Sequence, residues 1–487
     1  MRAIAEAEMK WGASCQRESH MTSRRPILQY ILLVGLPLLG VMGVLQLGKK
    51  VTAPLPAVGP WPLANLGTSP AAAGAPNLVT LLLQVAAIVI TARLVGVLFQ
   101  RIGQPQVMGE TVAGIMLGPS FLGWVAPGLS RALFPAASLS YLGALSQVGL
   151  LLFMFLVGLE FNSTRIRNLG RAVLLTSHAS ISLPFFLGSL AALFLYPRLS
   201  DRHVTFPAFA LFLGAAMSIT AFPVLARILA ERRLTRSELG ALAIACAAVD
   251  DVTAWGILAY IVAFVRASQH ANPLWITFAG VTVFVLLMIY GVRPLLRQFH
   301  IAFLRHGRVT ETMMAVLLLL LLLSAAMTEW LGIHLLFGAF LFGAILPRDD
   351  GFLRGITEKL ESVTLVLLLP LFFAFTGLRT SIGVVRGSEM WMYCILIILI
   401  AIVGKLGGST IASRAAGVPW RNAFALGILM NTRGLMELVI LNIGLEFGVI
   451  NQTLFSMMVL MALVTTFLTT PLLELVNPVR QSELVER

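Results

Sequence analysis

Stretches of about 20 apolar residues recur along almost the whole chain, and they limit its fold more than any other feature. A helix of that length crosses a hydrocarbon core of about 30 Å. Of the 487 residues, 58% are hydrophobic and 12% are charged, which is outside the range of ordinary soluble domains. We therefore predict an all-α polytopic membrane protein, with membrane lipid as its surrounding solvent.

The apolar spans divide the chain into five parts. A polar N-terminal segment (residues 1–25) precedes an extra transmembrane helix (residues 26–47) and a Pro-, Ala- and Gly-rich linker (residues 48–76). Residues 77–475 form a membrane domain of about thirteen further spans, and residues 476–487 form a short cytoplasmic tail. Approximate bounds of these further spans are 77–98, 106–126, 141–161, 173–196, 204–230, 238–266, 273–292, 310–331, 333–347, 360–380, 388–413, 421–447 and 453–475.

The first apolar stretch could also be a signal peptide. It is longer than the usual hydrophobic region of about 7–15 residues and lacks an Ala-x-Ala-like cleavage site, so we favour a retained helix.

Basic residues between the spans predict the orientation. Arginines gather in alternate loops, which the positive-inside rule places in the cytoplasm. They are Arg165, Arg167 and Arg171, then Arg232, Arg233 and Arg236, then Arg293, Arg297, Arg305 and Arg308. The net charge of +13 is thus spread along the chain and forms no continuous basic face for nucleic acid. Three separated cysteines predict neither a disulfide framework nor a metal site.

Two spans carry polar or helix-breaking residues at mid-depth. One contains Ser218–Pro223 and the other contains Asn431–Gly434. The two spans lie seven positions apart in the series, so they cross the membrane in opposite directions. Secondary transporters often place paired broken helices of an inverted repeat at the substrate site. We therefore predict an inverted-repeat fold with two crossed broken helices, in preference to two simple proline kinks.

An adjacent acidic pair, Asp250 and Asp251, lies within an apolar span. Each acidic group at the centre of a membrane helix costs about 3 kcal/mol, so the pair predicts a functional site. Neighbouring helical residues point about 100° apart, so the two carboxylates need not do the same job. A carboxylate at this depth can be neutralised by a proton or by a cation, and competition between the two would constitute exchange.

Further charged and polar residues lie near these features. Lys405 is in mid-span, and we propose Asp250 as its partner, with snorkelling to the interface as the alternative. Arg433 and Glu437 are one turn apart and could pair, and Arg433 could hold carbonyls freed at the break. We expect these two, with Asn431 and Thr432, to be structural polar groups at the second broken helix.

Other titratable residues are predicted to be peripheral. We expect interfacial positions near span ends for Glu110, Glu160, Glu311, Glu329 and Arg227. For His178 and His334 we expect packing between helices, with pH sensing as the alternative.

Four segments in the same order resemble the monovalent cation:proton antiporter-2 family, which includes the plant cation/proton exchangers. The resemblance covers residues 77–475 and rests on Ser218–Arg227, Asp250–Trp255, Gly404-Lys405 and Asn431–Leu438. It implies a homodimer, with a dimerisation part and a six-helix core in each subunit, which alternates between inward-open and outward-open states. It also implies a multi-pass protein of the cell (inner) membrane.

The resemblance further implies roles for individual residues. Asp251 would be the principal carrier of Na⁺ or K⁺ and of the proton, and Asp250 would be the second acidic residue, paired with Lys405. Ser218 and Thr220 would complete the cation's coordination shell. The family pattern implies electrogenic exchange. No cofactor is expected beyond the transported Na⁺ or K⁺ and H⁺, and no enzymatic activity is expected.

Three alternatives stay open at this point. A cation channel would also place charge and broken helices at mid-depth, although channels usually present rings of carbonyls or charges. A cation-coupled carrier of an organic solute would have a similar hydropathy. An intramembrane aspartyl protease needs two aspartates on facing helices, whereas here they share one helix, so it is the weakest alternative.

Overall fold

The computed structural model describes residues 24–52, 78–160, 170–201, 204–232, 234–235, 237–269 and 274–476. The polar N-terminal segment through residue 23, most of the predicted linker and the tail from residue 477 lie outside the described residues. Arg165, Arg167, Arg233 and Arg236 of the predicted cytoplasmic loops lie outside them too.

All regular structure in this part of the chain is helical, and each predicted span contains a helical segment. The elements are α2 (Arg24–Tyr30), η1 (Ile31–Gly35), α3 (Leu36–Gly48), α4 (Leu78–Arg101), α5 (Gln106–Leu117), α6 (Leu122–Val125), α7 (Pro127–Leu133), α8 (Ala136–Glu160), α10 (Arg171–Leu199), α11 (Phe206–Ser218), α12 (Phe222–Glu231), α13 (Glu238–Gln269), α14 (Leu274–Leu287), η3 (Met288–Val292), α15 (Arg293–His306), α16 (Glu311–Trp330), α17 (Leu335–Ile345), α18 (Asp350–Val363), η4 (Thr364–Leu368), α19 (Leu369–Arg379), η5 (Ile382–Val384), α20 (Gly387–Ala415), α21 (Trp420–Met430), α22 (Leu435–Glu446) and α23 (Gln452–Val476). Within the described ranges, 10 helices are long and apolar enough to cross a membrane, and the pair α21 and α22, bent by 40° at its break, makes up to 11. The chain is a multi-pass integral membrane protein.

The two halves of the membrane domain repeat the same helix contacts. α4 packs on α5 as α16 packs on α17, and α10 packs on α11 as α20 packs on α21. α10 contacts α13 as α20 contacts α23, while α5 packs on α19 and α17 packs on α8. The repeat joins α4–α13 to α16–α23, and it agrees with the inverted repeat predicted from the spacing of the two breaks.

Glycines at matching positions bring helices of the two halves together. A Cβ added to Gly114 of α5 would lie 2.2 Å from the α19 backbone, and one added to Gly377 of α19 would lie 2.5 Å from the α5 backbone. In the other half, a Cβ on Gly343 of α17 would lie 2.4 Å from the α8 backbone, and one on Gly158 would lie 2.3 Å from the α17 backbone. Because lipid provides no hydrophobic drive between helices, such close approach of backbones stabilises the bundle.

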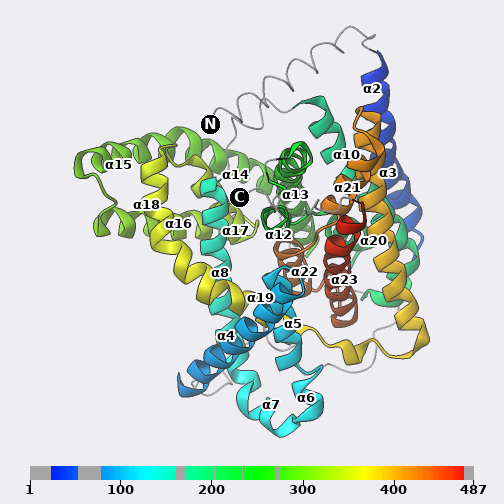
Figure 1. Ribbon diagram of the computed structural model, residues 1–487, viewed down its shortest axis with the longest axis horizontal. Helices are drawn as coiled ribbons and strands as arrows, with labels where there is room; N and C mark the ends of the chain where they lie inside the picture. Colours follow the sequence, from blue (N-terminus) through cyan, green and yellow to red (C-terminus); the bar gives the residue numbers. More distant parts are fainter. Residues whose placement is uncertain are drawn as a thin grey trace, which may run out of the picture.

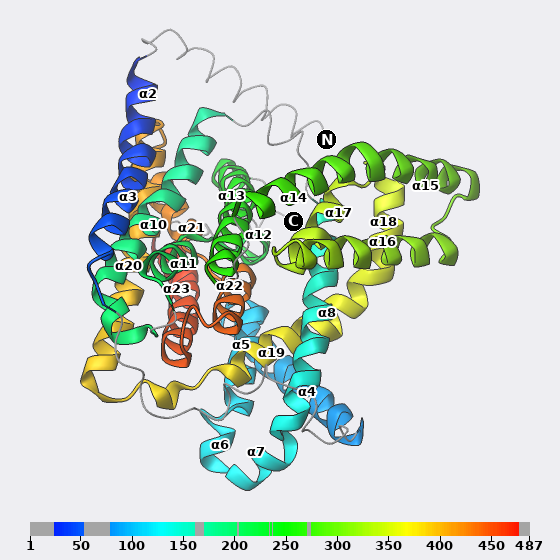
Figure 2. The same cartoon turned by 180° about the vertical axis from the view of Figure 1, so that it is seen from behind.

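Figures 1 and 2 show how the helices are distributed from opposite sides. In both views α2 and α3 lie at one edge with α10 and α20, while α15, α16 and α18 lie at the opposite edge. The broken helices α11–α12 and α21–α22 lie between these edges, together with α13 and α23.

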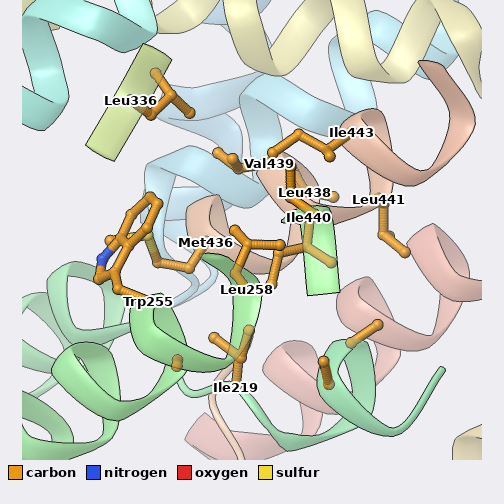
Figure 3. Packing of buried hydrophobic residues seen from close by; sticks show 14 of the residues in the cluster. Ile219, Trp255, Leu258, Leu336, Met436, Leu438, Val439, Ile440, Leu441 and Ile443 are labelled. Atoms are coloured by element: carbon orange, nitrogen blue, oxygen red, sulfur yellow. The ribbon is translucent and has the colours of Figure 1, made fainter. Parts of the chain in front are cut away.

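Apolar packing holds α13 and α22 near the breaks. Trp255 of α13 lies edge-on to Phe337 of α17, with ring centroids 5.1 Å apart, and stacks on Phe340 at 6.1 Å. Figure 3 shows part of this buried cluster, with Ile219, Trp255, Leu258, Leu336, Met436, Leu438, Val439, Ile440, Leu441 and Ile443 labelled. The cluster therefore joins the helix that carries the acidic pair to the second broken helix.

Candidate functional site

The two breaks contact each other directly. α11 ends at Ser218 and α12 begins at Phe222, which leaves residues 219–221 outside a helix. The backbone N–H of Ala221 donates to the carbonyl of Thr432 at 3.0 Å, and the Thr220 hydroxyl lies 3.0 Å from the Met430 carbonyl. The prediction of a crossed pair of broken helices is confirmed, and each break satisfies part of the other's backbone.

Arg433 closes the crossing. Its guanidinium donates to the carbonyls of Ala216 at 3.1 Å, Met217 at 2.5 Å and Ile219 at 2.9 Å, which belong to the end of α11 and the first break. It also lies 3.7 Å from Glu437, one turn along α22. The predicted pairing and the predicted binding of freed carbonyls are both present, and the side chain is 1% exposed. Arginine suits this position because its fork of donors reaches several acceptors at once.

Asp250 is fully buried and surrounded by donors. The hydroxyls of Ser177 and Ser180 on α10 donate to it at 2.6 and 2.8 Å, and the Thr220 hydroxyl lies 2.8 Å away. Lys405 of α20 pairs with it at 2.8 Å, so the predicted ion pair is present. Four side chains from three elements thus compensate one carboxylate that would be costly to bury alone.

Asp251 has very different surroundings. Its Oδ1 is buried and has no hydrogen-bond partner among the described residues, although the residue is 8% exposed. The backbone N–H of Phe222, at the start of α12, interacts with the carboxylate. Since helical neighbours point about 100° apart, Asp251 faces the N-terminus of α12 while Asp250 faces α10 and α20. The adjacent acidic pair therefore contains one saturated carboxylate, Asp250, and one with free coordinating capacity, Asp251.

The remaining predicted polar residues behave in different ways. The Ser218 hydroxyl donates to the Ala215 carbonyl of its own helix at 2.9 Å, while its carbonyl accepts from Lys405 at 2.5 Å. Asn431 Oδ1 is buried without a hydrogen-bond partner among the described residues. The Thr432 hydroxyl donates at 2.7 Å to a carbonyl one turn earlier in α21. Of the two predicted hydroxyl ligands, only Thr220 faces a carboxylate.

Ser177 and Ser180 were not predicted as site residues. They lie in the run Thr176-Ser177-His178-Ala179-Ser180 of an otherwise apolar span, three residues apart and so on one helix face. Such a pair in a membrane helix could have indicated a polar neighbour, because a serine hydroxyl in lipid needs an acceptor.

The interfacial position expected for Glu110 is wrong. Glu110 is 4% exposed and accepts a hydrogen bond at 3.0 Å from Gln106, one turn earlier in α5. Arg227 of α12 in turn donates to Gln106 at 3.4 Å. The polar contact between α5 and α12 allows this carboxylate to be buried despite its place near the end of a span.

Two cavities lie along one face of α23, on the predicted cytoplasmic side of the crossing. The larger, about 540 Å³, is lined by Gln104, Thr470 and the ion pair Arg232–Glu474, among others. The smaller, about 20 Å³, is lined by Arg433, Gly434, Thr466 and neighbouring residues. Because Thr466 and Thr470 are one turn apart, the cavities follow one stripe of α23 towards the second break.

An inverted repeat whose crossed broken helices enclose buried acidic residues defines the class of secondary transporters. Residues 87–475 match the family model for the transmembrane sodium/hydrogen exchanger, and the chain belongs to this family. The family consists of transporters and not enzymes, which excludes the protease alternative.

Several relatives are similar over most of the chain. It is 43% identical to the Na(+)/H(+) antiporter NhaS4 of Synechocystis sp., over 82% of this chain and 98% of the relative. It is 41% identical to cation/H(+) antiporter 19 of Arabidopsis thaliana and 33% identical to K(+)/H(+) antiporter 1 of Saccharomyces cerevisiae, in each case over 82% of this chain. The chain spans about half the length of these last two, 50% and 46%.

A solved structure shares the fold. The sodium proton antiporter MjNhaP1 from Methanocaldococcus jannaschii at pH 8 superposes with a TM-score of 0.57 at 13% sequence identity. The match covers 84% of this chain and 98% of the other.

Proposed function

We propose that this protein exchanges Na⁺ or K⁺ for H⁺ across a membrane. The Asp251 carboxylate binds the metal cation and the proton in turn. The observation that carries the proposal is the buried Oδ1 of Asp251, which has no hydrogen-bond partner within the described part of the chain, beside the fully compensated Asp250. The names of similar proteins, which include Na⁺/H⁺ and K⁺/H⁺ antiporters, support the choice of ions.

Coupling follows from the cost of an uncompensated charge. A bare carboxylate in a low-dielectric site must take up a proton or a cation before it can be moved away from water. If the site changes sides only when neutralised, delivery of one kind of ion requires the return of the other, which is exchange by alternating access. Channel-like flow would need an open pore, and a solute carrier would need recognition groups for the solute.

The coordination shell would be built from oxygen atoms at the crossing. Carboxylate, hydroxyl and carbonyl oxygens suit hard alkali cations. Asp251 would contribute, with carbonyls of the first break and the Asn431 Oδ1, which has no partner in the described ranges, as further candidates. The Thr220 hydroxyl, which lies 2.8 Å from the neighbouring Asp250, is another candidate. Asp250 would not coordinate the cation directly, since its carboxylate already pairs with Lys405.

Two finer properties belong to the same proposal. The Asp250–Lys405 pair, with Asp251 beside it, supports electrogenic exchange as the family resemblance implies. The same resemblance supports a homodimer, which chemical cross-linking in membranes would test. No resident cofactor is invoked.

The test is dissipation of an imposed pH gradient in proteoliposomes when Na⁺ and then K⁺ is added. We expect a cation-dependent signal for the native chain that is lost in Asp251→Asn. Asp349→Asn is the matched control, because it neutralises a carboxylate outside the spans. Retained exchange in Asp251→Asn would refute the carrier assignment. Cation flux without proton movement in the native chain would favour a channel or a solute carrier.

A further inference from the structure

The N-terminal helix formed by α2, η1 and α3 lies outside the residues matched by the family model, which begin at 87. It packs along α10 and contacts α11 (Figures 1 and 2). One side of it is lined with large, exposed apolar side chains such as Leu32, Leu36 and Leu39, which face the surrounding lipid. The opposite side buries Val34, Val41 and Val44 against the bundle.

Polar contacts fix this helix to two others. Gln29 donates to the Ala415 carbonyl of α20 at 3.2 Å and accepts from Arg171 of α10 at 2.7 Å. The Tyr30 hydroxyl lies 2.8 Å from Nδ1 of His178, with the two rings edge to face. Gln29 therefore bridges α10 and α20, and His178 packs between helices as predicted.

Further along, a distortion of the helix adds another contact. Ile31–Gly35 is a π-helical turn, and Ser182 of α10 donates to the Leu33 carbonyl at 3.2 Å within it. Such turns leave a carbonyl without its usual partner in the helix, and here α10 supplies one.

The two faces of α10 have separate tasks. Ser177 and Ser180 donate to Asp250 on one face. Leu175, His178, Ala179 and Ser182 lie on the other face, about half a turn around, where Leu175 and Ala179 are buried in a cluster with Val34 and with Ala412 of α20. Lys405 lies two turns before Ala412 on α20. The N-terminal helix thus covers the lipid side of the two helices that supply Asp250 with three of its partners.

We propose that the N-terminal helix positions the exchange site. Gln29 bridges α10 and α20, and Tyr30 fixes the N-terminal helix to α10, so that Ser177, Ser180 and Lys405 keep their places around Asp250. This inference rests on the proposed function. Gln29 and Tyr30 are positioning residues, since their hydrogen bonds go to residues other than Asp250 and Asp251. Gln29 contacts the first residue of α10 and the last residue of α20, at their predicted cytoplasmic ends, so its two hydrogen bonds hold the N-terminal helix in register with both.

The test compares Tyr30→Phe combined with Gln29→Leu against the matched control Leu39→Val, which alters only the lipid-facing side. Exchange in proteoliposomes is measured as maximal rate, as KM for the cation and as a pH profile, with thermal unfolding in detergent measured in parallel. We expect KM to rise about fivefold and the pH profile to shift, because Lys405 would be displaced from Asp250, the residue next to Asp251. The control should match the native chain.

If the double variant has a lower unfolding temperature but a native KM and pH profile, the N-terminal helix only stabilises the fold, and the inference is overturned. A native result for all readouts would overturn it as well. In a second arm, Tyr30→Phe should have no additional effect in a His178→Asn background if the two residues act as a pair. Absence of exchange in the native chain would instead overturn the proposed function, and this inference with it.

Discussion

The two sides of α13 show how differently a membrane protein can treat adjacent carboxylates. On the side facing α10 and α20, Asp250 receives three hydroxyl groups and an ammonium group. On the side facing the N-terminus of α12, Asp251 keeps an oxygen without a hydrogen bond among the described residues. Burial alone does not separate them, because both residues are less than 10% exposed, at 0% and 8%.

The difference teaches that compensation, and not depth, decides what a buried acid can do. A saturated carboxylate gains little from a further cation, whereas an unsaturated one binds a cation or a proton to recover what it lost on leaving water. The first break and the start of α12 together contact both carboxylates, since Thr220 faces Asp250 and Phe222 faces Asp251. Small movements of this segment would therefore change the balance between them.

The largest effect is expected for Lys405→Gln, which removes the ammonium group that pairs with Asp250. A buried charge left without its partner costs about 3–5 kcal/mol, so the free energy of unfolding should fall by that order. Exchange should also lose its native dependence on membrane potential, because Asp250 would become a second uncompensated acid. Voltage-clamped proteoliposomes and thermal unfolding measure the two effects.

Lys359→Gln is the matched control for this change. Lys359 of α18 donates to the Val309 carbonyl at 2.7 Å, away from both carboxylates. An unaltered voltage response in Lys405→Gln would argue against the division of tasks between Asp250 and Asp251.

A smaller effect is expected for Arg433→Lys, which loosens the first break on both sides at once. One ammonium group cannot reproduce the three carbonyl contacts of the guanidinium, and a lost charge-assisted hydrogen bond costs about 1.5–3 kcal/mol. Unfolding temperature and exchange rate should fall together. Arg414→Lys, which alters an exposed arginine near the end of α20, should change neither. A native exchange rate in Arg433→Lys would show that the crossing tolerates a looser break.

Much of this arrangement could be predicted from the sequence, because each predicted feature is costly in lipid. Apolar runs predict the spans, two adjacent acids predict a site, and a mid-span lysine predicts an acidic partner. Ser177 and Ser180 were missed because a serine in a membrane helix usually bonds to its own backbone. Ser218 shows this behaviour, since its hydroxyl donates to Ala215, and the Ser180 hydroxyl, besides facing Asp250, also lies 2.9 Å from the Ser177 carbonyl of its own helix. Which serine faces an acid depends on helix rotation, and the spacing along one helix does not determine it.

Ser180→Ala tests this last point and should have a modest effect. Asp250 would lose one of its donors, for about 1 kcal/mol of stability and a small rise in KM for the cation. Ser218→Ala removes a hydroxyl that donates to the Ala215 carbonyl of its own helix, so it is the matched control and should match the native chain. Equal effects of the two variants would mean that the hydrogen bond from Ser180 to Asp250 makes no specific contribution to stability or to cation binding.

The smallest effect is expected at Asp349, a carboxylate near the membrane surface that extends the comparison. The Phe352 backbone N–H, which the side chain caps at 2.8 Å, lowers the pKa of Asp349, and His300 at 3.4 Å adds to this. Because the folded-state pKa lies below the unfolded value of about 3.9, the stabilisation is present above that value and is lost as pH falls through the folded-state pKa. Asp349→Ala should therefore destabilise the protein by about 0.5 kcal/mol at neutral pH, at the low end for a helix cap, and the difference should vanish in acid.

Exchange by Asp349→Ala should match the native chain, since Asp349 stays charged and does not bind a proton in the working pH range. A change in the pH profile of exchange in Asp349→Ala would show that acids outside the crossing take part in exchange. It would contradict the proposal that Asp251 is the carboxylate that binds the transported ions.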